Sequence, residues 1–169
     1  MKEQLFSDLE GLRIGMAIEE YGQNFYQQAY ELSKVAKHKE LFMLLKGEEI
    51  IHLKTFSKLY EELKSKKQAN EDEYLFDLET SRYLTVLAEG HIFPTDNQVE
   101  VKLSEAVSVE EILKMAIQAE KDSILFYDEL AEKSKFNEAK SIFIRLKEEE
   151  QVHVVKLRKI LDECRLDSK

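Results

Sequence analysis

Cysteine, proline and tryptophan are scarce in this sequence of 169 residues, which has one cysteine, one proline and no tryptophan. Because Cys164 is alone, the chain can form no internal disulfide, no Cys-x-x-Cys redox pair and no metal site built from several thiolates. Five glycines and one proline provide too few turn residues for a sandwich of many short strands. Helices are therefore favoured.

Long apolar runs and basic clusters are also missing. No window approaches the roughly 18 to 20 apolar residues that span a bilayer, and the N-terminus leads into no apolar stretch, so we expect a soluble, cytoplasmic protein. A formal net charge of -9 argues against binding of nucleic acid or of an anionic membrane. The length and the 43% hydrophobic content fit one folded domain over residues 1–169.

Four segments repeat apolar residues every three or four positions, which is the pattern of helices packed along one seam. They run from about 7 to 35, 38 to 66, 108 to 134 and 138 to 166. Ser7 with Glu10 and Ser108 with Glu111 have the spacing of a capping box at a helix start. Asn137 stands where an N-cap should precede the last helix.

The stretch from about 67 to 107 is long enough to cross the height of a helical bundle. Its apolar residues between Leu75 and Leu87 predict a short extra helix, which should end before Gly90. A turn is expected from Pro94 to Asn97.

The sequence repeats itself with an offset of 101 residues and no gap. Glu19 falls on Glu120, Phe25-Tyr26 on Phe126-Tyr127, Glu48-Glu49 on Glu149-Glu150, and His52 on His153. Each copy is one helical hairpin, over about 7–66 and about 108–166. Two hairpins joined by a long crossover predict an all-α, antiparallel four-helix bundle with approximate internal twofold symmetry.

Each predicted helix places one glutamate in its apolar seam, and two helices add a histidine three residues later. These residues are Glu19, Glu49, His52, Glu120, Glu150 and His153. Four carboxylates in a core of low dielectric constant would be strongly destabilising if they stayed ionised and unpaired. Ordinary buried ion pairs are the weaker alternative, because the seams contain no lysine or arginine.

Two divalent ions would balance the negative charge of these four carboxylates. The set matches the two-metal sites of four-helix bundles, which take a Glu from each of two helices and Glu-x-x-His from each of the other two. Carboxylate with imidazole suits iron or manganese better than calcium, and the lack of thiolates argues against a structural zinc site. We therefore predict two metal ions per chain, iron first, with manganese or zinc as alternatives.

These residues resemble the rubrerythrin branch of the ferritin-like superfamily over nearly the whole chain. The motifs that carry the resemblance are Glu19 to Tyr26, Glu120 to Tyr127, Glu48 to His52 and Glu149 to His153. The resemblance implies a ferritin-like fold in which Glu49 and Glu150 bridge the metals, while Glu19, Glu120, His52 and His153 are terminal ligands. It also implies that Tyr26 and Tyr127 donate hydrogen bonds to the ligand carboxylates and assist with protons; ordinary core tyrosines are the alternative.

The same resemblance implies an oxidoreductase that reduces hydrogen peroxide, or dioxygen, with electrons from an external rubredoxin-like protein or flavoprotein. It further implies a homodimer. The sequence departs from the family because it lacks the four-cysteine rubredoxin module and because Ser123 stands where rubrerythrins carry an additional glutamate. A ferroxidase or iron-handling protein, and a metal-stabilised binding protein without turnover, remain open alternatives.

Four further residues are weaker candidates. His38 and His91 are predicted to be surface or loop residues rather than ligands. Gly15 and Gly22 lie one heptad apart in the first helix, where either close packing or a channel for a small oxidant would explain them.

Overall fold

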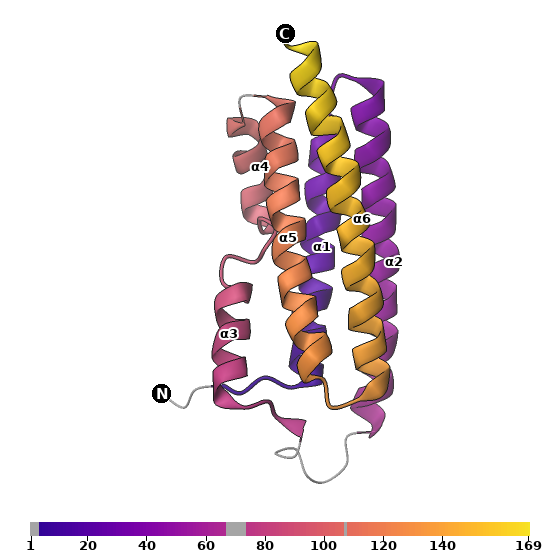
Figure 1. Cartoon of the computed structure of the whole chain (residues 1–169), viewed down its shortest axis with the longest axis vertical. Coiled ribbons are helices and arrows are strands. Elements are labelled where there is room, and N and C mark those ends of the chain that lie inside the picture. The colour runs from indigo at the N-terminus through magenta and orange to yellow at the C-terminus, as the bar shows by residue number, and fades with distance from the viewer. Residues whose placement is uncertain (1–3, 67–73, 107) are drawn as a thin grey trace.

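The computed structural model describes residues 4–66, 74–106 and 108–169, and it confirms the all-α fold (Figure 1). Four long helices form the antiparallel bundle: α1 (Asp8–Leu32), α2 (Ala36–Lys66), α5 (Val109–Lys133) and α6 (Asn137–Asp167). Helix α1 packs along α2, and α5 packs along α6, so each half of the chain is one hairpin. The two hairpins meet where α2 contacts α6 and α1 contacts α5.

Serine side chains begin two of the long helices, as the sequence predicts. Ser7 accepts a hydrogen bond from the backbone N–H of Glu10 at 3.2 Å, and Ser108 accepts one from Glu111 at 3.4 Å. Such caps satisfy backbone donors that have no partner in the first turn of a helix.

The start of α6 differs from the prediction, because Asn137 is its first helical residue and Phe136 is the N-cap residue. The side chain of Phe136 has no oxygen to accept a bond. Instead, Asp8 of α1 reaches across and accepts hydrogen bonds from the backbone N–H groups of Lys135 and Phe136, at 2.9 and 3.0 Å. A tertiary contact thus replaces the local cap.

The described part of the crossover contains two short helices rather than one, both along one side of the bundle in Figure 1: α3 (Leu78–Ala88) and α4 (Asp96–Glu105). The turn predicted from Pro94 to Asn97 is therefore wrong in its second half, because α4 already begins at Asp96. Only Val99 and Leu103 of α4 are buried, so its apolar stripe was too short to indicate a helix from sequence. Residues 67–73 of the predicted crossover lie outside the described residues.

The interior of the bundle is densely aromatic around a polar centre. The large side chains with less than 2% exposure include Phe25, Tyr26, Phe42, Phe56, Phe126, Tyr127 and Phe143. Near its middle, each long helix also buries one glutamate. None of the described helices has the length and apolarity needed to cross a membrane.

Candidate metal centre

The structure brings the six residues of the predicted ligand set together in the bundle interior, each with a fractional exposure of 1% or less. They form two groups, within each of which the potential ligand atoms all lie within 4.8 Å of one another. One group contains Glu19, Glu49, His52 and Glu150, and the other contains Glu49, Glu120, Glu150 and His153. Glu49 and Glu150 belong to both groups, which is where bridging ligands would lie.

Both imidazoles direct Nδ1 towards the carboxylates. His52 Nδ1 lies 3.0 Å from Glu150 and 3.2 Å from both Glu19 and Glu49. His153 Nδ1 lies 2.7 Å from Glu150 and 3.2 Å from Glu120. The two rings are nearly parallel, with their centroids 5.6 Å apart. The internal repeat has thus produced two equivalent halves of one centre.

The other ring nitrogen of each histidine contacts a glutamate of the opposite hairpin. His52 Nε2 lies 2.7 Å from Glu149, and His153 Nε2 lies 2.9 Å from Glu48. Lys156 in turn contacts Glu48 at 3.2 Å. The sequence prediction missed this role of Glu48 and Glu149, although the repeated Glu-Glu doublet was a signal for it. Each acid precedes a seam glutamate and therefore points about 100° away from it on the helix, towards a partner that only the folded bundle brings near.

The two tyrosine hydroxyls also reach across the bundle. Tyr26 donates a hydrogen bond to Glu120, and Tyr127 donates one to Glu19. Both tyrosines are fully buried, and their rings pack in the aromatic core. They therefore combine core packing with a polar contact to the glutamate of the opposite hairpin.

Buried carboxylate oxygens show that the cluster fits bound cations. Glu49 Oε1 and Glu120 Oε2 have no hydrogen-bond donor among the described residues. Among the described residues, the ion pairs of the four seam glutamates have only His52 and His153 on the cationic side. Buried acceptors without donors are costly, so oxygens and nitrogens arranged in this way fit a pair of divalent ions.

Two comparisons with known proteins found similarity to this chain. The Rubrerythrin family model matches residues 111–169, which include Glu120, Glu150 and His153. A solved structure from Thermotoga maritima, described as a ferritin-like diiron-carboxylate protein, is similar with a TM-score of 0.71 and 24% sequence identity. The similarity covers 95% of this chain and 98% of that chain.

The second hairpin is similar to the Rubrerythrin family model, and the fold of the chain is ferritin-like. The internal repeat extends the same ligand pattern to the first hairpin of this ferritin-like bundle. A search of curated proteins found no match.

Without metal, the buried cluster of glutamates and histidines holds protons. Burial, followed by repulsion from Glu150, raises the pKa of Glu120 to about 8, and burial with the neighbouring carboxylates raises that of Glu49 well above its usual value. Burial by itself would raise the pKa of Glu150 too, but hydrogen bonds from His153 and His52 outweigh this effect and lower its pKa to about 2. Desolvation by itself would lower the pKa of the two imidazoles, yet the surrounding carboxylates raise both pKa values far above the usual value. Metal binding would displace these protons.

The weaker sequence candidates lie outside the cluster. His38 Nε2 lies 3.5 Å from Cys164 Sγ, and His91 is exposed with its ring edge-on to Tyr21. Ser123 offers no carboxylate, and its hydroxyl donates to the backbone oxygen of Ala119 at 3.1 Å.

The two candidate glycines of α1 are sites of close packing. A Cβ on Gly15 would lie 3.1 Å from the ring of Phe56, and one on Gly22 would lie 3.2 Å from the ring of Phe93. These rings occupy the space that an open channel along α1 would need.

Proposed function

We propose that this chain is a non-haem di-iron protein that reduces hydrogen peroxide, or dioxygen, with electrons from an external donor. The observation that carries the proposal is the pair of overlapping groups, which share Glu49 and Glu150 and contain one imidazole each. Six oxygen and nitrogen ligands without a thiolate suit iron, and manganese or zinc are the alternatives.

In the proposed role, two metal ions would be held by Glu19, Glu49, His52, Glu120, Glu150 and His153, and Glu49 and Glu150 would be the ligands common to both. Two ferrous ions held there would supply the two electrons that, with two protons, convert one hydrogen peroxide into two waters. An external rubredoxin-like protein or flavoprotein would return those two electrons. The chain's single cysteine cannot supply a four-thiolate iron site for this purpose.

In this proposal the two tyrosines are hydrogen-bond donors that orient the ligand carboxylates. Burial, followed by the charges of neighbouring glutamates, raises the pKa of Tyr26 and Tyr127 well above the usual value. Both hydroxyls therefore stay protonated at neutral pH, and their hydrogen bonds hold the carboxylates of Glu120 and Glu19 in place. We also propose that the protein acts as a homodimer in the cytoplasm.

Metal content and peroxide turnover test the proposal. Protein reconstituted with Fe²⁺ under anaerobic conditions should bind about two irons per chain, and Glu150→Ala, which removes a shared ligand, should lose most of this iron. Glu148→Ala is the matched control, because Glu148 is an exposed glutamate of the same helix turn. The wild type should then reduce peroxide for many cycles when a reductant is present.

Other outcomes would assign a different role. Faster oxidation of the reduced centre by dioxygen than by peroxide, with Fe²⁺ consumed as a substrate, would indicate a ferroxidase or iron-handling protein. Metal binding without any turnover would indicate a metal-stabilised binding protein. If no metal binds after reconstitution, the di-iron proposal is wrong.

A further inference from the structure

The loop that joins α3 to α4 has an unusual backbone. Three consecutive residues, Gly90, His91 and Ile92, have positive φ values of 82°, 64° and 59°. Glycine adopts this left-handed conformation freely, but a β-branched residue such as isoleucine rarely does. A strained segment of this kind persists only where the surrounding structure holds it, and such segments concentrate at functional sites.

The strained loop delivers the side chain of Phe93 into the bundle. Phe93 is 1% exposed, although it belongs to the crossover and not to one of the four long helices. Its ring centroid lies 5.5 Å from that of Phe25 and 5.8 Å from that of Tyr26, the tyrosine that donates to Glu120. The loop therefore places an aromatic ring directly beside the candidate metal centre.

Gly22 of α1 lets this ring approach a bridging carboxylate. A Cβ on Gly22 would lie 3.2 Å from Phe93 and 3.5 Å from the carboxyl carbon of Glu49. The ring and the carboxylate thus border the same point on α1, where the residue has no side chain. In the second copy of the repeat the position carries Ser123, and the crossover loop lies outside the repeat. The close approach of the Phe93 ring to Glu49 therefore belongs to the first hairpin.

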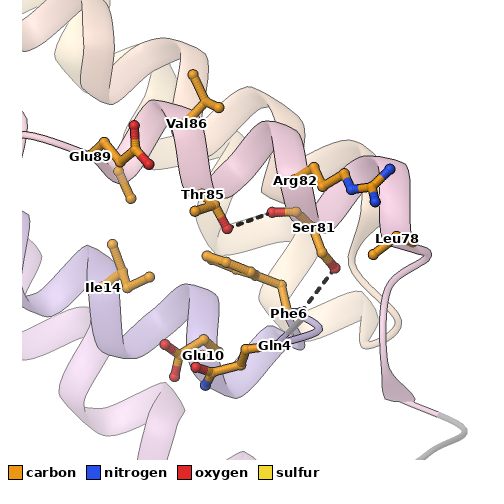
Figure 2. A pocket seen from close by; sticks show the side chains of 11 residues that line it. Gln4, Phe6, Glu10, Ile14, Leu78, Ser81, Arg82, Thr85, Val86 and Glu89 are labelled. Atoms are coloured by element: carbon orange, nitrogen blue, oxygen red, sulfur yellow. Dashed lines mark hydrogen bonds between the residues drawn. The ribbon is translucent and has the colours of Figure 1, made fainter. Parts of the chain in front are cut away.

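A surface groove ends at the outer side of the same loop. A hollow of about 270 Å³ has Ile18, Tyr21, His91 and Ile92 among its lining residues. It shares Ile14 and Ala88 with a larger hollow of about 700 Å³ between α1 and α3. Figure 2 shows Ile14 of α1 facing α3 across this larger hollow. The groove brings solvent to the loop that carries Phe93, and the ring of Phe93 lies near the position of Gly22, beside Glu49.

We propose that Phe93 closes a side entrance to the metal centre and is a specificity-determining residue for the oxidant. The proposal rests on the proposed function for the identity of that oxidant. The ring packs closely against the position of Gly22, so this entrance opens only when the ring moves, and a small movement is enough for hydrogen peroxide. An alkyl or aryl hydroperoxide has to displace the ring before its O–O bond reaches the candidate centre beside Glu49. Phe93→Ala should remove this size limit.

Removal of iron by a chelator measures the entrance without any catalysis. Anaerobic protein loaded with Fe²⁺ is mixed with increasing concentrations of ferrozine, a bulky chelator that must reach the iron directly to accelerate its removal. In Phe93→Ala the rate should rise with ferrozine concentration and exceed the wild-type rate by about tenfold or more, because opening no longer requires a buried ring to leave its site. Phe93→Leu, a milder change, should give an intermediate rate and serves if the alanine variant does not fold.

Phe56→Ala is the matched control. Phe56 is also a fully buried ring that packs on a glycine of α1 and on a tyrosine of the centre, but it belongs to α2 inside the bundle. The control should keep a removal rate that does not depend on ferrozine concentration. If Phe56→Ala accelerates iron removal as much as Phe93→Ala does, or if both Phe93 variants behave as the wild type, the proposal of an entrance at Phe93 is wrong.

A second readout concerns the oxidant itself. Phe93→Ala should raise the rate with cumene hydroperoxide relative to hydrogen peroxide by about tenfold or more, whereas an unchanged ratio would overturn the size limit. Failure of the proposed function looks different: neither peroxide would be turned over by any variant, while the ferrozine experiment would still report on the entrance.

Discussion

At the scale of single residues, each histidine of the centre is held at both ring nitrogens. Nδ1 faces the seam carboxylates, and Nε2 contacts Glu149 or Glu48 from the opposite hairpin. A carboxylate at the outer nitrogen fixes the orientation of a metal-binding imidazole and increases its basicity. In the proposed metal centre, these two acids would therefore orient both histidines before a metal binds.

We expect Glu149→Ala to weaken metal binding by about 10- to 100-fold, because His52 loses the partner that orients it. Glu149→Gln keeps an acceptor oxygen and should lose less. Competition with a chromophoric chelator measures both affinities, and Glu148→Ala on the exposed face of α6 is the control. Equal affinities for Glu149→Ala and this control would show that the contact has no role in binding.

At the scale of elements, the α5–α6 turn depends on a residue from α1. Asp8 is 1% exposed and accepts the backbone N–H groups of Lys135 and Phe136. The turn therefore forms its last contacts only when the first hairpin packs against the second. The two helix starts with their own serine caps were predictable, whereas this one was not, because its acceptor lies 127 residues away in the chain.

Asp8→Ala should lower the free energy of unfolding by about 1–3 kcal/mol, because two backbone donors lose their acceptor. Asp8→Asn keeps a side-chain oxygen at the same position and should be less destabilising. Urea unfolding followed by circular dichroism gives both values. A smaller loss in the alanine variant than in the asparagine variant would contradict this account of the turn.

At the scale of the whole molecule, the centre joins the two hairpins. Each four-residue group takes ligands from both hairpins, so neither hairpin contains a complete group by itself. Ions bound there would bind the folded bundle and not the unfolded chain, and would stabilise it accordingly.

Stability should consequently respond to pH in opposite ways with and without metal. Glu120 and both histidines have raised pKa values in the metal-free fold, so the folded state holds more protons than the unfolded chain. Stability that depends on those protons is present at low pH and is lost as the pH rises. For Glu120 the loss is complete once the pH has passed its folded-state pKa of about 8. The melting temperature of metal-free protein should therefore fall between about pH 6 and pH 9.

Metal-loaded protein should show the reverse trend over the same range, because proton competition for the ligands weakens as the pH rises. With free metal at about 100 times the dissociation constant, each independent site adds about 2.7 kcal/mol to the free energy of unfolding. Thermal melts with metal or with EDTA measure both curves. Parallel curves would show that the protons and the metal do not share these ligands.

The sequence by itself determined the four amphipathic helices, their pairing into two hairpins and the six residues that meet in the centre. Those features follow from periodicity along one helix and from the repeat, both of which are local properties of the chain. Only the tertiary structure decided that Tyr26 reaches Glu120, that His52 reaches Glu149 and that Phe93 lies against Gly22. These contacts join elements far apart in sequence, and they depend on the relative height and rotation of packed helices, which no local pattern encodes.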